Sequence, residues 1–104
     1  KYNPADLIDI NDLNWVSLWY RTNNINNLET CEIIFYVDAS NYASYSFTAQ
    51  VLAVDTWYKI RVHFDDFTVT GTMEWDEIDY ILIRQEHTTD QAFTIVVDDI
   101  GGYE

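Results

Sequence analysis

The residues of this chain that are best suited to chemistry include two adjacent carboxylates close to its end. Asp98 and Asp99 follow an apolar run at 95–97 and precede Ile100, Gly101 and Gly102. Like charges at this separation disfavour one another, so a metal ion or another cation that balances them is one explanation for the pair. The pair is therefore a candidate site for a positively charged group.

Side chains that carry out covalent or acid–base chemistry are few. The histidines are His63 and His87, the single thiol is Cys31, and the sequence pairs no base with that thiol. Neighbouring strand residues point to opposite faces, so neither Asp65-Asp66 nor Asp98-Asp99 is expected to form a converging acid–base couple. Histidine and acidic residues also lack the spacing of a metal site. We therefore predict that the chain is not an enzyme.

Strand patterns run through most of the chain. Apolar segments of strand length recur between polar turns, and no long window has the 3.6-residue period of a helix. The fold predicted from this pattern is all-β, an antiparallel two-sheet β-sandwich. A polar loop at 23–30 and a long connection at 65–77, with a short helical turn at 75–78, separate some of the strands. The predicted strands cover residues 15–22, 32–38, 43–49, 57–64, 80–86 and 92–100.

Alternation along the strands separates a core face from an outer face. Val16, Leu18 and Tyr20 share one side of the first strand, and aliphatic residues take the equivalent side of later strands. Apart from Lys1, every basic residue falls on the opposite side, together with several aromatic rings. This predicted outer set is Trp19, Arg21, Lys59, Arg61, His63, Tyr80 and Arg84.

Two interpretations of the outer set are open. If its strands are neighbours, the set forms one face with aromatic platforms and cationic donors. Such a face suits sugars, because ring C–H groups stack on aromatic rings while the donors bind hydroxyl groups. The alternative is cross-strand ion pairing with Glu32 and Glu86, worth about 0.2–1 kcal/mol per pair, together with aromatic shielding of the sheet.

Composition narrows the classes of partner. The 104 residues suit one domain, and the 48% hydrophobic content is enough to form a core. The net charge of −13 argues against nucleic acid and against an anionic membrane surface. No apolar run reaches the roughly 20 residues of a membrane span. Calcium binding, a sugar ligand with no charge preference and a well-solvated acidic surface remain compatible with the charge.

Several segments together resemble a known family. WYKIRVHFDDFTVTG at 57–71, WDEIDYILIR at 75–84 and FTIVVDDIGGY at 93–103 are similar to the C-terminal half of jelly-roll carbohydrate-binding modules of the galactose-binding-like type. WVSLWYRTN at 15–23 and IIFYVDASNYASYSF at 33–47 fit the middle strands of the same pattern. The resemblance covers about residues 12–103.

The resemblance implies a jelly roll that serves as a non-catalytic carbohydrate-binding module of a larger extracellular enzyme or adhesin. Its partner would be a polysaccharide or another glycan. The family often holds a structural calcium ion, for which Asp98 and Asp99 would be the carboxylate ligands. Calcium takes six to eight oxygen ligands, and Asp6 and Asp9 could contribute to this number. The alternative is that one aspartate of the pair caps the end of the strand and the other faces solvent.

The chain departs from the family at its N-terminal side. The usual first strands are reduced to residues 1–14, which we interpret as a lead-in or a partial first strand before a single sandwich domain at 15–104. A sandwich without its first strand has an unpaired edge, and such an edge can be completed by another chain or by upstream residues.

A second function class follows from the same fold. The domain could be a structural or assembly β-sandwich in a surface fibre, a virion appendage or a filament. Both functions imply an extracellular location or one on a cell or virion surface.

Overall fold

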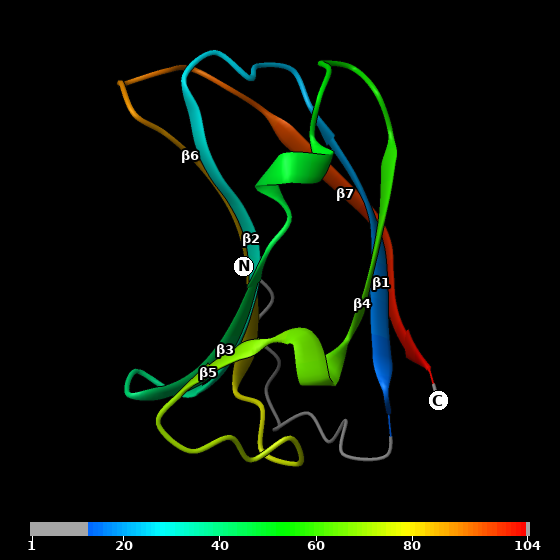
Figure 1. The fold of residues 1–104 in the computed structure, drawn as a ribbon, viewed down its shortest axis with the longest axis vertical. Helices are drawn as coiled ribbons and strands as arrows, with labels where there is room; N and C mark the ends of the chain where they lie inside the picture. The colour runs from blue at the N-terminus through cyan, green and yellow to red at the C-terminus, as the bar shows by residue number, and fades with distance from the viewer. Residues whose placement is uncertain (1–12, 104) are drawn as a thin grey trace.

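Residues 13–103, which the computed structural model describes, form two antiparallel sheets that face each other (Figure 1). The three-stranded sheet has the order β4 (Tyr58–His63), β1 (Trp15–Thr22), β7 (Ile95–Tyr103). The four-stranded sheet has the order β5 (Thr68–Thr70), β3 (Asn41–Ser46), β2 (Leu28–Asp38), β6 (Tyr80–His87). Two short 3-10 helices, η1 (Thr48–Gln50) and η2 (Phe64–Asp66), precede and follow β4. The predicted all-β, two-sheet antiparallel sandwich is confirmed.

Besides one-residue differences in β4 and β6, the strand boundaries differ from the predicted ones in four places. β3 covers Asn41–Ser46 instead of residues 43–49, and η1 follows it at Thr48–Gln50. β2 begins at Leu28, inside the predicted loop at 23–30, because Leu28 pairs with His87 of β6. β7 begins at Ile95 and continues to Tyr103. β5 lies within the predicted connection at 65–77, and its three residues pair with β3. Residues 1–12 are outside the described part of the chain, so the predicted lead-in or partial first strand remains a prediction.

Burial follows the predicted alternation in the first strand. Val16, Leu18 and Tyr20 of β1 are buried, and Ile60 and Val62 of β4 join them in the core. From the opposite sheet, β2 contributes its own buried apolar residues. Removing these side chains from water supplies the main free energy that holds the two sheets together. The outer side of β1 is therefore displayed on a rigid, well-packed strand.

A chain of hydrogen bonds crosses the core and fixes a loop. The Tyr20 hydroxyl donates to Gln85 Oε1 at 2.6 Å, and Gln85 Nε2 donates to the Asn24 carbonyl at 2.8 Å. Gln85 Nε2 is also 2.8 Å from His87 Nε2, while His87 Nδ1 is 2.7 Å from the Asn26 carbonyl. A carbonyl only accepts, so His87 carries its proton on Nδ1 and accepts from Gln85 at Nε2. The network links β1, β6 and the 23–27 loop.

Tyr20 gives the fold a dependence on alkaline pH. Its side chain is fully buried, and burial raises the pKa of the Tyr20 phenol well above its usual value of 10.0. Above pH 10 the unfolded chain releases this proton while the folded chain keeps it, so the free energy of unfolding falls as pH rises. We expect Tyr20 to contribute a slope of up to about 1.4 kcal/mol per pH unit.

Urea unfolding of the Tyr20→Phe variant between pH 7 and pH 11 measures this contribution. At pH 7 the variant should be less stable by about 1–3 kcal/mol, because Gln85 Oε1 loses a buried donor. Its stability should fall less steeply than that of the wild type above pH 10. Parallel curves for the two proteins over the whole range would contradict the proposed role of Tyr20.

Candidate functional site

The outer face of the three-stranded sheet carries most of the predicted set. In the strand register, Trp15 lies opposite His63 of β4, and Trp19 lies opposite Lys59. On its other side Trp19 lies opposite Asp98 of β7. Residues directly opposite on one face have Cβ atoms about 4.5–5.5 Å apart, so Lys59, Trp19 and Asp98 form one row across three strands. β1 and β4 are thus neighbours, which is the condition that the sugar-binding interpretation set for these two strands.

Each tryptophan on this face has a cationic side chain close to its ring. The Arg61 guanidinium lies 4.4 Å from the centroid of Trp15, and the Lys59 ammonium lies 5.9 Å from that of Trp19. A third cation, Arg21, lies 6.0 Å from the ring centroid of Trp57. Contacts of this kind are worth about 0.5–1 kcal/mol at exposed sites.

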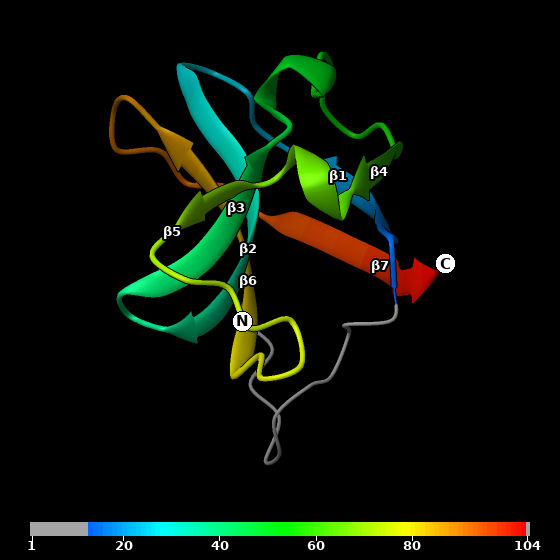
Figure 2. The same ribbon diagram turned by 60° about the horizontal axis from the view of Figure 1, so that its bottom comes forward.

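A β-bulge in β7 changes the direction of its acidic pair. Ser17 pairs with Gly101 and Trp19 pairs with Asp98, so two residues of β7 stand opposite Leu18 alone. Asp99 occupies the bulge with φ of 50°, in the left-handed region, and Asp98 Oδ1 accepts from its backbone N–H at 2.9 Å. β7 lies along β1 at the edge of the sheet (Figure 2).

The bulge brings both carboxylates to one place. Trp19, Trp57, Asp98 and Asp99 together line an open depression of about 310 Å³, which we call the tryptophan depression. Strict alternation predicts that Asp98 and Asp99 point to opposite faces. The extra residue in β7 interrupts this period of two, and both residues line the same depression.

Trp57 is not in the outer set predicted from the sequence, although its position indicated the same face. It has the same parity as Lys59 and Arg61 and precedes β4 by one residue. The structure leaves 42% of its surface exposed, so part of the indole is available for contact with another molecule. Its neighbour Arg21 also forms an ion pair with Asp55 at 3.6 Å. One exposed indole of the depression therefore has an ion-paired cation near its ring.

His63 belongs to this face but has a local structural role. Its Nδ1 accepts a hydrogen bond from the Asp65 backbone N–H at 3.1 Å, which caps η2. The Asp65 carboxylate lies 3.5 Å from the same nitrogen, but a nitrogen that accepts carries no proton, so we interpret the contact as the cap and not as an ion pair. The edge of the ring also contacts Trp15, with centroids 4.9 Å apart.

Tyr80 and Arg84 do not join this face, because β6 belongs to the other sheet. Tyr80 stacks on Tyr36 with ring centroids 4.5 Å apart, and Tyr36 in turn contacts Tyr42 at 5.2 Å. These tyrosines form an aromatic row across β6, β2 and β3. The single face expected from parity is thus divided between the two outer surfaces of the sandwich.

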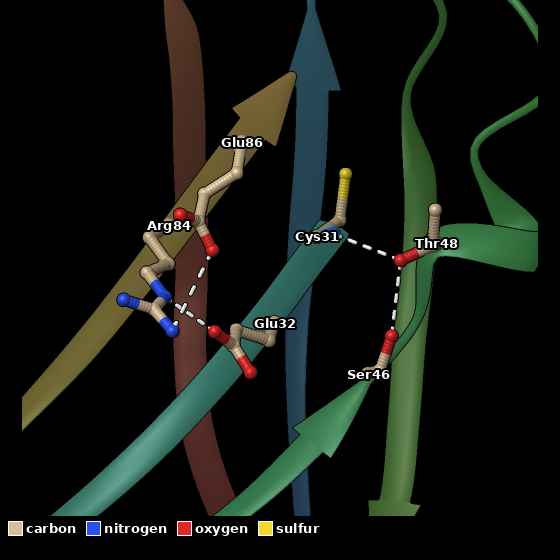
Figure 3. A network of polar contacts seen from close by, with 6 residues as sticks. All are labelled: Cys31, Glu32, Ser46, Thr48, Arg84 and Glu86. Atoms are coloured by element: carbon tan, nitrogen blue, oxygen red, sulfur yellow. Dashed lines mark hydrogen bonds and ion pairs between the residues drawn. The ribbon is translucent and has the colours of Figure 1, made fainter. Parts of the chain in front are cut away.

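Arg84 forms the ion pairs that the alternative interpretation predicted. It lies between Glu32 of the neighbouring strand and Glu86 of its own strand, with an Nη2–Oε1 distance of 3.6 Å to Glu86 (Figure 3). The hydrogen bond to Glu32 raises the pKa of the Arg84 guanidinium. For this residue, cross-strand charge pairing accounts for the position without a ligand.

The described residues alone do not supply a calcium site. Between residues 13 and 103, no group of three or more His, Cys, Asp and Glu side chains is arranged to hold a metal ion. Asp98 and Asp99 offer fewer oxygens than the six to eight that calcium takes. Asp6 and Asp9 lie outside the described residues, so the predicted calcium site remains a prediction.

Cys31 is placed where it has little reactivity. Its side chain is buried, and its sulfur lies 3.7 Å from the Tyr20 hydroxyl. Burial raises the pKa of the Cys31 thiol, which keeps it protonated at neutral pH. The thiolate needed for nucleophilic chemistry is therefore disfavoured at this position.

No helix in the described part of the chain is long and apolar enough to cross a membrane.

Comparisons with protein-family models, with curated protein sequences and with solved structures gave no match to this chain. The resemblance to galactose-binding-like modules accordingly remains a prediction from the sequence. What is known of the site comes from its own geometry.

The bulge has a measurable stability signature at Asp99. Glycine adopts positive φ without strain, whereas a β-branched residue is strained there. We expect Asp99→Val to be less stable than Asp99→Gly by about 1–2 kcal/mol. In an extended strand position such as Thr68 of β5, the order should reverse, because valine favours strands and glycine does not. Thermal unfolding of the four variants measures both differences, and the same order at both positions would argue against the bulge.

Proposed function

We propose that this domain is a non-catalytic carbohydrate-binding module of a larger extracellular or surface-located protein, and that it binds a polysaccharide or another glycan on the outer face of the three-stranded sheet. The observation that carries this proposal is the tryptophan depression, in which Trp19 and Trp57 adjoin the carboxylates of Asp98 and Asp99. The location is part of the same proposal and follows from the ligand class.

The geometry fits the two kinds of contact that sugars make. Exposed indole surface removes the apolar C–H face of a sugar ring from water, and aromatic side chains contribute large areas at low entropic cost. Carboxylates and ammonium groups at the edge of the depression bind hydroxyl groups. Asp98 and Lys59 flank Trp19 on opposite sides, so a sugar on this indole reaches an acceptor and a donor.

Substitution of the two tryptophans tests the proposal. A glycan array with the wild-type protein identifies a ligand, and calorimetric titration then gives its affinity. We expect Trp19→Ala and Trp57→Ala each to weaken binding at least tenfold, about 1.4 kcal/mol, because the stacking surface is lost. Tyr80→Ala is the matched control, since it removes an aromatic ring from the opposite outer surface and should leave the affinity unchanged.

Two outcomes would count against this proposal. A loss of glycan affinity in Tyr80→Ala as large as that in Trp19→Ala would show that binding is not specific to the outer face of the three-stranded sheet. The absence of binding to any glycan by the folded wild-type protein would remove the function itself.

A structural or assembly role is the second candidate, and exposed apolar residues on edge strands favour it. Val96 and Ile100 of β7 are 45% and 46% exposed, and Val69 of β5 is exposed as well. Among residues 13–103, β5 and β7 each pair with one strand only. Such edges, with apolar side chains, are suited to contacts between copies or with another chain, including completion of a sheet by an added strand. Light scattering discriminates the two candidates. Large particles without any glycan binding would support assembly, and a glycan-binding monomer would oppose it.

A further inference from the structure

We infer that the tryptophan depression selects uncharged glycans over anionic ones, with Asp98 and Asp99 accepting hydrogen bonds from sugar hydroxyl groups. The inference rests on the proposed function and specifies the class of glycan. It assigns the two carboxylates to the glycan, whereas the family resemblance implied that they bind a calcium ion.

The chemistry of the acidic side of the depression defines what it binds. An ionised carboxylate only accepts hydrogen bonds, so the ligand has to present donors at this side. Within residues 13–103, the hydrogen bond from the Asp99 backbone to Asp98 Oδ1 uses one acceptor position, and both residues line the depression. Sugar hydroxyl groups supply donors of this kind, and the carboxylate or sulfate of an acidic sugar does not.

The cations of the face do not reverse this preference. The Arg61 guanidinium lies over Trp15, and Arg21, which lies 6.0 Å from the Trp57 ring centroid, forms an ion pair with Asp55. Lys59 stands on the β4 side of Trp19, opposite the β7 side that carries the acidic pair. The face is therefore basic along β4 and acidic along β7, with Trp19 between them.

A hydroxyl group suits this two-sided arrangement because it donates to a carboxylate and accepts from an ammonium group. An anionic substituent would meet Asp98 and Asp99 on one side of the ring. The net charge of −13 adds repulsion at longer range, which lowers the encounter rate with a polyanion. Both effects act in the same direction and favour an uncharged glycan.

Affinity electrophoresis tests the inference directly. The probes are uncharged polysaccharides (mixed-linkage β-glucan, unsubstituted xylan and galactomannan) and anionic ones (polygalacturonate and alginate), each cast alone in a native gel. We expect at least one uncharged probe to retard the wild type and neither anionic probe to do so. The Asp98→Asn/Asp99→Asn double variant should bind the uncharged probe at least tenfold more weakly and should gain retardation by an anionic probe.

The adjacent pair Asp65-Asp66 supplies a matched control. Asp65→Asn/Asp66→Asn changes the net charge by the same amount on η2, away from the depression, and should behave like the wild type. A shift toward anionic probes in this control as large as in the Asp98→Asn/Asp99→Asn variant would show that global charge, and not the site, decides the selection.

The possible failures are distinguishable. Preferential binding of an anionic probe by the wild type, or unchanged binding of the uncharged probe by Asp98→Asn/Asp99→Asn, overturns the inference. In either case, loss of binding in Trp19→Ala leaves the proposed function standing. If no probe of either class retards the wild type and no glycan binds it in solution, the proposed function and the inference both fall.

Discussion

The pairing of β1 with strands on both of its sides is the constraint on which the outer face depends. Among the described residues, β4 and β7 pair with β1 and not with each other. The register of both edge strands is therefore set by one strand, whose inner side chains are buried in the core. Because a shift of one residue would turn that inner set to solvent, burial of Leu18 and Tyr20 also fixes which residues flank Trp19.

Local periodicity predicts the faces of β1 and β4 correctly, because alternation depends only on the backbone of a single strand. It does not determine which strands share a sheet. β6 has the same alternation as β4, yet its pairing with β2 places Tyr80 and Arg84 on the opposite surface. Sheet membership depends on contacts between residues far apart in sequence, and no window of one strand contains that information.

The acidic pair illustrates a second limit of alternation. One residue inserted opposite Leu18 changes the faces of the residues that follow it, and such an insertion has no fixed sequence pattern. Aspartate does tolerate positive φ better than most residues, so Asp99 was compatible with a bulge without requiring one. The short strand β5 was also missed, because three residues are too few to show a period.

Shielding of the sheet by its own side chains explains part of the outer face but not all of it. Trp15 has Arg61 at 4.4 Å over its ring and the His63 ring against it, which is sufficient to account for its position. Trp57 is different, since its nearby cation lies at 6.0 Å and much of the indole stays in water. The exposed part of the Trp57 indole is apolar surface that a stacked ligand would remove from water. The β-bulge in β7 also bears on the site. A break in pairing alone would protect the β7 edge from pairing with another strand. The bulge does more than this, because Asp98 and Asp99 line the depression together with the two indoles.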